Sequence, residues 1–461
     1  MRPNCLSFWE VVAQSVANVA PVATPTLIIP LVFASSGNGT WLAYLLATVA
    51  MLLVTYHINQ FARRSASPGA LYTFVTHGLG PTWGVISGWS LVIAYIFTGA
   101  SVLGGAANYI VVLAHLFLPS RFDLAVAAGS MLVAAGAAWW VASRDIQLST
   151  RAMLLIEFTS VTLILILAAV YLIKSGRLVD RAQLGLAGVT PGGIRLGLVL
   201  ATFSFVGFES ATALGHEARD PLRSIPRSVL LSVFVAGGFF IFVSYVLTMA
   251  FHGQAVSLGE SNEPLTVVAR LARIPAFGIA IAAGAAMSEF ACALASINAA
   301  SRVIFTMSRH GLLPAAAGRA HASRSTPHVA VHVSSFIVIA APLAMLFWRI
   351  TPLNILGYLG SLATYGFLFA YVLIAVASPV YLRRRGELSA MSVGVAIAAL
   401  ALLAMPLVGA VYPVPAAPAN YLPYIFLALL VLGTARFLYV RSRRPDMIRA
   451  IEKDLAAPGG A

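Results

Sequence analysis

The chain has little charge for its length, and this shortage excludes an ordinary soluble fold. Only 10% of its 461 residues are Asp, Glu, Lys or Arg, whereas 60% are hydrophobic, and the mean hydropathy is +0.90. Soluble domains carry about 25% charged residues. Apolar runs of membrane-spanning length recur to the end of the chain, so the sequence predicts an all-α polytopic membrane protein.

Cysteine and catalytic motifs are also scarce. The two cysteines, Cys5 and Cys292, lie far apart, and no Cys/His group has metal-ligand spacing, so we expect neither a disulfide framework nor a metal site. No nucleophile–base pair, cofactor motif or channel-filter motif is visible, which argues against an enzyme and against a channel. Since no such motif is present, we also expect no cofactor.

The N-terminal MRPNCLSFWEVV does not have the pattern of a cleaved signal peptide.

Acidic residues are fewer than basic ones, which gives a net charge of +14. In a soluble domain this excess would suggest nucleic acid, but most of the 29 lysine and arginine residues fall in short loops on one side of the expected spans. Such loops set membrane orientation. We therefore predict no nucleic-acid partner, a cytoplasmic (inner) membrane location, and both termini and the 302–327 loop in the cytoplasm.

About twelve apolar runs have the roughly 20 residues that a transmembrane helix needs. They are expected near 10–33, 41–62, 82–113, 123–143, 151–174, 194–215, 228–251, 274–301, 328–348, 353–381, 391–411 and 421–440.

Two of these runs are interrupted. The first contains Pro21, Pro25 and Pro30, and the sixth contains the sequence FSFVGFES, in which Gly207 precedes Glu209. Proline and glycine weaken a helix, and freed backbone groups are tolerated in a membrane only inside protein or beside a cavity. Paired interruptions five helices apart point to a transporter with two inverted repeats. We predict repeats at residues 1–180 and 181–388, two extra helices at 389–440, and a cytoplasmic tail at 441–461.

Three sequence blocks resemble the amino acid–polyamine–organocation superfamily of secondary transporters. They are SPGALYTFVTHGLGPTWGVISGW at 67–89, the GFES, EARDP and IPR elements within 203–227, and SRVIFTMSRHGLLP at 301–314 with STPHVAV at 325–331. The blocks occur in the family's order, and the resemblance covers nearly the whole chain. The chain departs from the family's pattern in two places. In the first span, residues 20–24 read APVAT where relatives often have a glycine-rich break, and residue 310 is histidine where relatives usually have aspartate.

The resemblance implies a leucine-transporter-like 5+5 core with substrate bound between the interrupted spans. Half-helix ends offer partial charges that suit the carboxylate and ammonium of an amino acid. The expected substrate-binding residues, mostly through their backbone, are Ala20, Pro21, Val22, Ala23, Thr24, Phe205, Val206, Gly207, Phe208 and Glu209.

Three carboxylates lie inside predicted spans, where a charge is costly and therefore indicates a function. Glu209 either titrates or contacts a substrate ammonium, or it holds the broken helix open. Glu157 lies where the resemblance places a cation or a lysine in relatives, and it either exchanges a proton or pairs with a polar group of a helix. Glu289 shares a helical face with Cys292 and Ser296 and is a further coupling candidate. Tyr95 and Tyr365 are candidates for a gate or pocket wall by position alone.

The sequence thus predicts a secondary transporter that moves amino acids, with the proton as coupling ion. Two alternatives stay open at this point: a carrier of polyamines or other organic amines, and a nutrient sensor that binds its ligand without transporting it.

Overall fold

The computed structural model describes residues 2–443 without Asn262, Ala322–Arg324, Pro413 and Pro415, and also describes Ile451. Most of the 441–461 tail and part of the 302–327 loop therefore lie outside the described residues. The described part is helical. Its β-pairing is limited to one isolated bridge between Leu6 and Ala218.

The helices follow the predicted spans closely. The first half holds α1 (Phe8–Val19), η1 (Thr24–Ile28), α2 (Ile29–Ser36), α3 (Thr40–Ala62), α4 (Leu71–Leu79), α5 (Pro81–Ala114), α6 (Asp123–Arg144) and α7 (Ile146–Ser175). Next come α8 (Arg181–Leu184), α9 (Pro191–Phe203), η4 (Ser210–Leu214), α10 (Pro221–Phe251), α11 (Pro264–Leu271), α12 (Ala276–Arg309), α13 (His328–Phe347), α14 (Pro352–Arg384), α15 (Ala390–Gly409) and α16 (Leu422–Arg443).

Within the described residues, ten helical runs are long and apolar enough to cross a membrane. The first of them, Phe8–Ala62, contains two predicted spans, and the predicted sixth span is present as the shorter α9 followed by η4. All predicted spans therefore have a helical counterpart. The protein is an all-α, multi-pass membrane protein.

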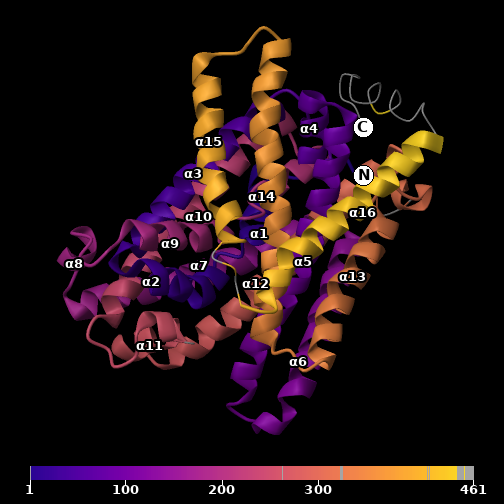
Figure 1. Cartoon of the computed structure of the whole chain (residues 1–461). Coiled ribbons are helices and arrows are strands. Elements are labelled where there is room, and N and C mark those ends of the chain that lie inside the picture. Colours follow the sequence, from indigo (N-terminus) through magenta and orange to yellow (C-terminus); the bar gives the residue numbers. More distant parts are fainter. Residues whose placement is uncertain are drawn as a thin grey trace.

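The core of the bundle is formed by α5, α12 and α14, with α5 packed against both of the others. The last two helices, α15 and α16, lie against this bundle, α15 beside α14, α3 and α9, and α16 beside α5 and α14 (Figure 1). Short helices precede both 34-residue helices: α4 precedes α5, and α11 precedes α12. This order repeats in the two halves of the chain.

The chain leaves α-helical geometry at both places where the sequence predicts a break. α1 ends at Val19, Ala20 takes a left-handed conformation with φ 48°, and a π-helical turn starts at Thr24. In the sixth span α9 ends at Phe203, Gly207 has φ +89°, and only the short η4 follows. Proline explains the first break because it removes a backbone donor, and glycine permits the second because it tolerates positive φ.

Candidate functional site

The two breaks lie against each other. The side-chain amide of Asn18, at the end of α1, donates to the carbonyl of Gly207 at 3.3 Å. One turn earlier in α1, the carbonyl of Gln14 accepts from the Ser210 hydroxyl at 3.1 Å. All four residues are buried. The irregular segments of α1–η1 and α9–η4 therefore face each other inside the protein.

Gly207 cannot be replaced at this contact without a shift of its neighbours. A Cβ added there would lie 2.0 Å from Asn18 Nδ2, and the positive φ of this residue disfavours any side chain. The glycine that the sequence singles out is thus required both for the backbone turn and for the approach of α1.

The ten residues expected to bind substrate lie in the two irregular segments that meet here. Nine of them are buried, and Val206 is partly exposed: the buried ones are Ala20, Pro21, Val22, Ala23, Thr24, Phe205, Gly207, Phe208 and Glu209. Among the described residues, the buried Thr24 hydroxyl has no hydrogen-bond partner. The junction can therefore offer backbone groups and one free hydroxyl to a small polar molecule.

Glu209 joins the second break to two long helices. One carboxylate oxygen accepts from the Tyr95 hydroxyl of α5 at 2.7 Å, and the other accepts from the Tyr371 hydroxyl of α14. The Tyr371 hydroxyl also accepts from the backbone N–H of Gly207 at 3.1 Å. A single fully buried carboxylate therefore connects α5, α14 and the broken sixth span.

Glu157 pairs with a helix hydroxyl. The Ser288 hydroxyl lies 2.9 Å from each of its carboxylate oxygens, so this contact joins α7 to α12. Both residues are buried.

Glu289 has a different environment from the other two acids. It is fully buried, and neither of its carboxylate oxygens has a hydrogen-bond partner among the described residues. Its helical neighbours are occupied: the Cys292 thiol donates to the Asn18 carbonyl at 3.4 Å, and the Ser296 hydroxyl donates to Asn18 Oδ1 at 2.8 Å. The face that the sequence singles out on α12 therefore packs on the first break.

The three sequence blocks also meet, at one end of the bundle. Arg302 of the third block makes a two-point ion pair with Glu217 of the second, with both N–O distances 2.7 Å. His310 of the third block lies 2.5 Å from the Tyr72 hydroxyl of the first.

Comparison of the sequence with known proteins identifies the family of this chain. Residues 10–448 match the family model described as amino acid permease. The chain belongs to that family. It is 25% identical to a branched-chain amino acid permease of Bacillus subtilis, over 77% of this chain and 76% of the relative. It is 24% identical to a methylthioribose transporter of the same species (80% and 79% covered) and to a low-affinity putrescine importer of Escherichia coli (65% and 66% covered).

Membership of the permease family makes the protein a transporter of small molecules and not an enzyme. The relatives' names cover amino acids, a polyamine and a sugar derivative, so the family by itself leaves the substrate open.

Two residues of the permease junction were not predicted from the sequence. Asn18 lies in an ordinary-looking helical stretch, and its contacts depend on helices more than 180 residues away. On α14 the sequence pointed to Tyr365, which packs against Phe426 of α16, whereas Tyr371 contacts Glu209. The spacing between the two tyrosines, nearly two helical turns, could not show which one meets the sixth span.

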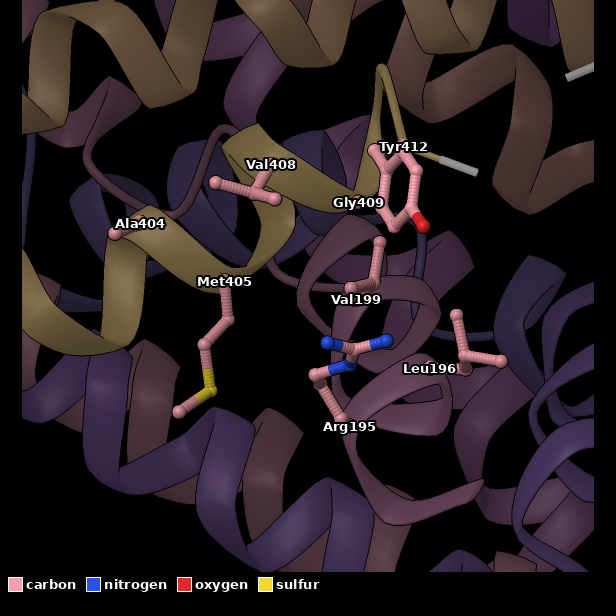
Figure 2. A pocket seen from close by; sticks show the side chains of 8 residues that line it. All are labelled: Arg195, Leu196, Val199, Ala404, Met405, Val408, Gly409 and Tyr412. Atoms are coloured by element: carbon pink, nitrogen blue, oxygen red, sulfur yellow. The ribbon is translucent and has the colours of Figure 1, made fainter. Parts of the chain in front are cut away.

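A groove of about 220 Å³ lies away from this junction, between α9 and α15. Figure 2 shows its lining, with the Arg195 guanidinium of α9 lying between Met405 and Leu196, and Tyr412 beyond Val199. It contains none of the expected substrate-binding residues.

Proposed function

We propose that this permease is a secondary transporter that binds an amino acid between the two helix breaks and moves it by alternating access. The observation that carries the proposal is the meeting of the breaks at Asn18 and Gly207 in the interior of the bundle. Breaks of this kind expose helix ends inside the protein, where a small charged molecule can replace the missing hydrogen bonds.

The charges at these ends suit an amino acid. The C-terminal end of α1 carries negative partial charge and favours an ammonium group, whereas the start of the helical segment at Thr24 carries positive partial charge and favours a carboxylate. The buried Thr24 hydroxyl is available as an additional partner. Because an α-amino acid carries both charged groups on one carbon, it fits such a junction better than an ion of one sign.

In this proposal, the hydrogen bonds of Glu209 hold the sixth span against the tyrosines of α5 and α14. Glu209 has two hydroxyl donors, Tyr95 and Tyr371, and Tyr371 also holds the N–H of Gly207. A movement that separates α5 from the sixth span must break these contacts, which makes Tyr95 a gating residue.

Proton coupling is assigned to Glu157. This carboxylate is buried between α7 and α12, and its only side-chain donor among the described residues is the Ser288 hydroxyl. A serine hydroxyl can donate to a charged carboxylate and can accept from a protonated one, so the pair tolerates both states. Gain or loss of the proton then shifts the balance between two arrangements of α7 and α12.

The repeated order of elements supports two inverted repeats. In each half a broken span is followed by a long helix, a short helix and a 34-residue helix: α3, α4 and α5 in the first half, and α10, α11 and α12 in the second. We assign residues 1–180 and 181–388 to the repeats and 389–440 to the added pair. The arginine-rich loops support a cytoplasmic location for both termini. A Ser323→Cys variant, in the part of the loop outside the described residues, should react only with reagent inside the cell.

The test is uptake into proteoliposomes. Purified protein is offered labelled amino acids and amines one at a time, with and without an inward proton gradient. Accumulation of an amino acid that rises with the gradient supports the proposal. Transport that persists unchanged in a Gly207→Ala variant would contradict the assigned site, and accumulation that ignores the gradient would contradict proton coupling.

A carrier of organic amines is the second candidate function. Three acids, Glu157, Glu209 and Glu289, are buried in the membrane-spanning helices. The buried Arg302 is already paired with Glu217, so it does not neutralise them. A positively charged substrate would pair with an ionised carboxylate and would favour ionisation of these acids.

A further inference from the structure

Glu289 is a buried acid to which the proposed transport cycle assigns no role. Glu209 has two hydroxyl donors and Glu157 has one, but neither oxygen of Glu289 has a hydrogen-bond partner among the described residues. Leaving a buried carboxylate unpaired is expensive. A ligand with donor groups would satisfy both oxygens.

The Glu289 carboxylate packs directly on a glycine of α5. A Cβ on Gly105 would lie 2.7 Å from Glu289 Oε1, so any larger residue there would press on the carboxylate. One turn further along α5, the buried Tyr109 hydroxyl also has no hydrogen-bond partner among the described residues. The carboxylate therefore lies where α12 packs on α5.

The position relative to the break follows from helix geometry. Cys292 and Ser296 both touch Asn18, the residue that ends α1 at the break. Glu289 precedes Cys292 by one turn on the same face, which at 1.5 Å per residue is about 4.5 Å along the helix. A substrate anchored at the break needs only a short alkyl chain to place a second charged group at this carboxylate.

We propose that Glu289 binds the distal ammonium of a cationic substrate, a basic amino acid or a diamine, and so determines that the permease prefers such substrates. This inference rests on the proposed binding site between the helix breaks. The carboxylate supplies two acceptors, and an ammonium carries three donors, so the pair satisfies charge and hydrogen bonding together.

A metal ion fits these surroundings less well than an ammonium. No group of three or more His, Cys, Asp or Glu side chains in the described part of the chain is arranged to hold a metal. Calcium and magnesium need six or more oxygen ligands. An ammonium on a flexible chain needs no such cage.

The experiment compares substrates across matched variants in proteoliposomes. Labelled lysine, putrescine and leucine are offered to the unchanged protein, to Glu289→Gln, to Gly105→Ala, and to Glu260→Gln as the same substitution at an exposed site. Leucine transport also reports whether each variant is folded.

We expect the unchanged protein to prefer lysine or putrescine over leucine. Glu289→Gln should weaken apparent affinity for the cationic substrates about 10-fold or more, because the ammonium loses its counter-charge and keeps only a hydrogen bond to a neutral amide. Gly105→Ala should act in the same direction because it displaces the carboxylate. Leucine transport should change less than about 2-fold in either variant, and Glu260→Gln should resemble the unchanged protein.

Each of the following outcomes would overturn the inference. Cationic substrates that bind Glu289→Gln as tightly as the unchanged protein would show that the carboxylate does not contact them. Equal loss for lysine and leucine, or loss of proton stimulation for both, would make Glu289 a structural or coupling residue. Transport of leucine alone by the unchanged protein would refute the substrate class and leave the proposed function standing, whereas no transport of any amino acid or amine would refute both.

Discussion

The ion pair between Glu217 and Arg302 offers the sharpest test of how the sequence blocks hold the fold together. Its side chains are 1% and 2% exposed, and both of its N–O distances are 2.7 Å. The backbone carbonyl of Glu217 also accepts from the amides of Cys5 and Leu6 at 2.8 and 2.9 Å. One residue thus ties α12 to the end of the sixth span and to the N-terminal segment.

Replacement of one partner should destabilise the protein strongly. Glu217→Gln keeps the shape of the side chain but leaves the Arg302 guanidinium buried without its counter-charge, which costs about 3–5 kcal/mol. The pair between Arg64 and Glu387 is a matched control, since it is 2.6 Å long but 30% and 38% exposed. Glu387→Gln should cost less than about 1 kcal/mol because solvent screens that pair.

The assay is the apparent unfolding temperature in detergent at one fixed heating rate, followed by intrinsic fluorescence. Glu217→Gln and Arg302→Gln should each lower it far more than Glu387→Gln. The double variant Glu217→Gln/Arg302→Gln should be less destabilised than the two single effects added together, because removal of both charges avoids the unpaired ion. Additive effects, or a Glu217→Gln temperature equal to that of Glu387→Gln, would refute the reasoning.

Three further predictions concern the site and the N-terminal segment. Glu157→Gln should bind and exchange substrate normally but lose acceleration by an inward proton gradient, and accumulation that still follows the gradient would make Glu157 structural. Gly207→Ala should lower uptake at least about 10-fold, since its Cβ would lie 2.0 Å from Asn18 Nδ2, whereas the exposed Gly238→Ala, which meets nothing within 4 Å, should be near neutral. Burial, reinforced by the charge of Glu217, raises the pKa of the Cys5 thiol from 9.0 to about 11. Maleimide labelling of Cys5, identified by mass spectrometry, should therefore be slow at pH 7 and speed up toward pH 11. This thiol's contribution to stability should be lost over the same rise from pH 9 to 11, and labelling at pH 7 as fast as that of a free small thiol would contradict the shift.

The helices and their breaks could be predicted because their causes are local. Apolar run length sets the spans, and Pro21, Pro25 and Gly207 act within a few residues of themselves. The burial of Glu209 was also predictable. A carboxylate in an apolar, membrane-spanning run is too costly to face lipid, so it is expected to face the protein interior.

The partners of these residues could not be predicted, because they depend on helix rotation and on distant packing. Ser288 and Glu289 are adjacent in α12, yet one contacts Glu157 of α7 and the other faces Gly105 of α5. Consecutive residues on a helix point about 100° apart. A single sequence does not give the rotation of α12, so it left the pairing of Glu157 open.

The contacts of α12 provide a physical reason why coupling and substrate recognition can be linked. Three residues within two turns of this helix make these contacts: Ser288 contacts Glu157, Glu289 faces α5, and Cys292 contacts Asn18 at the first break. A helix moves as a rigid body over such a short distance, so a displacement of α12 changes all three contacts at once. We therefore expect a proton at Glu157 and a cation at Glu289 to bias the same movement of α12 against the first break, which is the differential interaction that a two-state transporter requires.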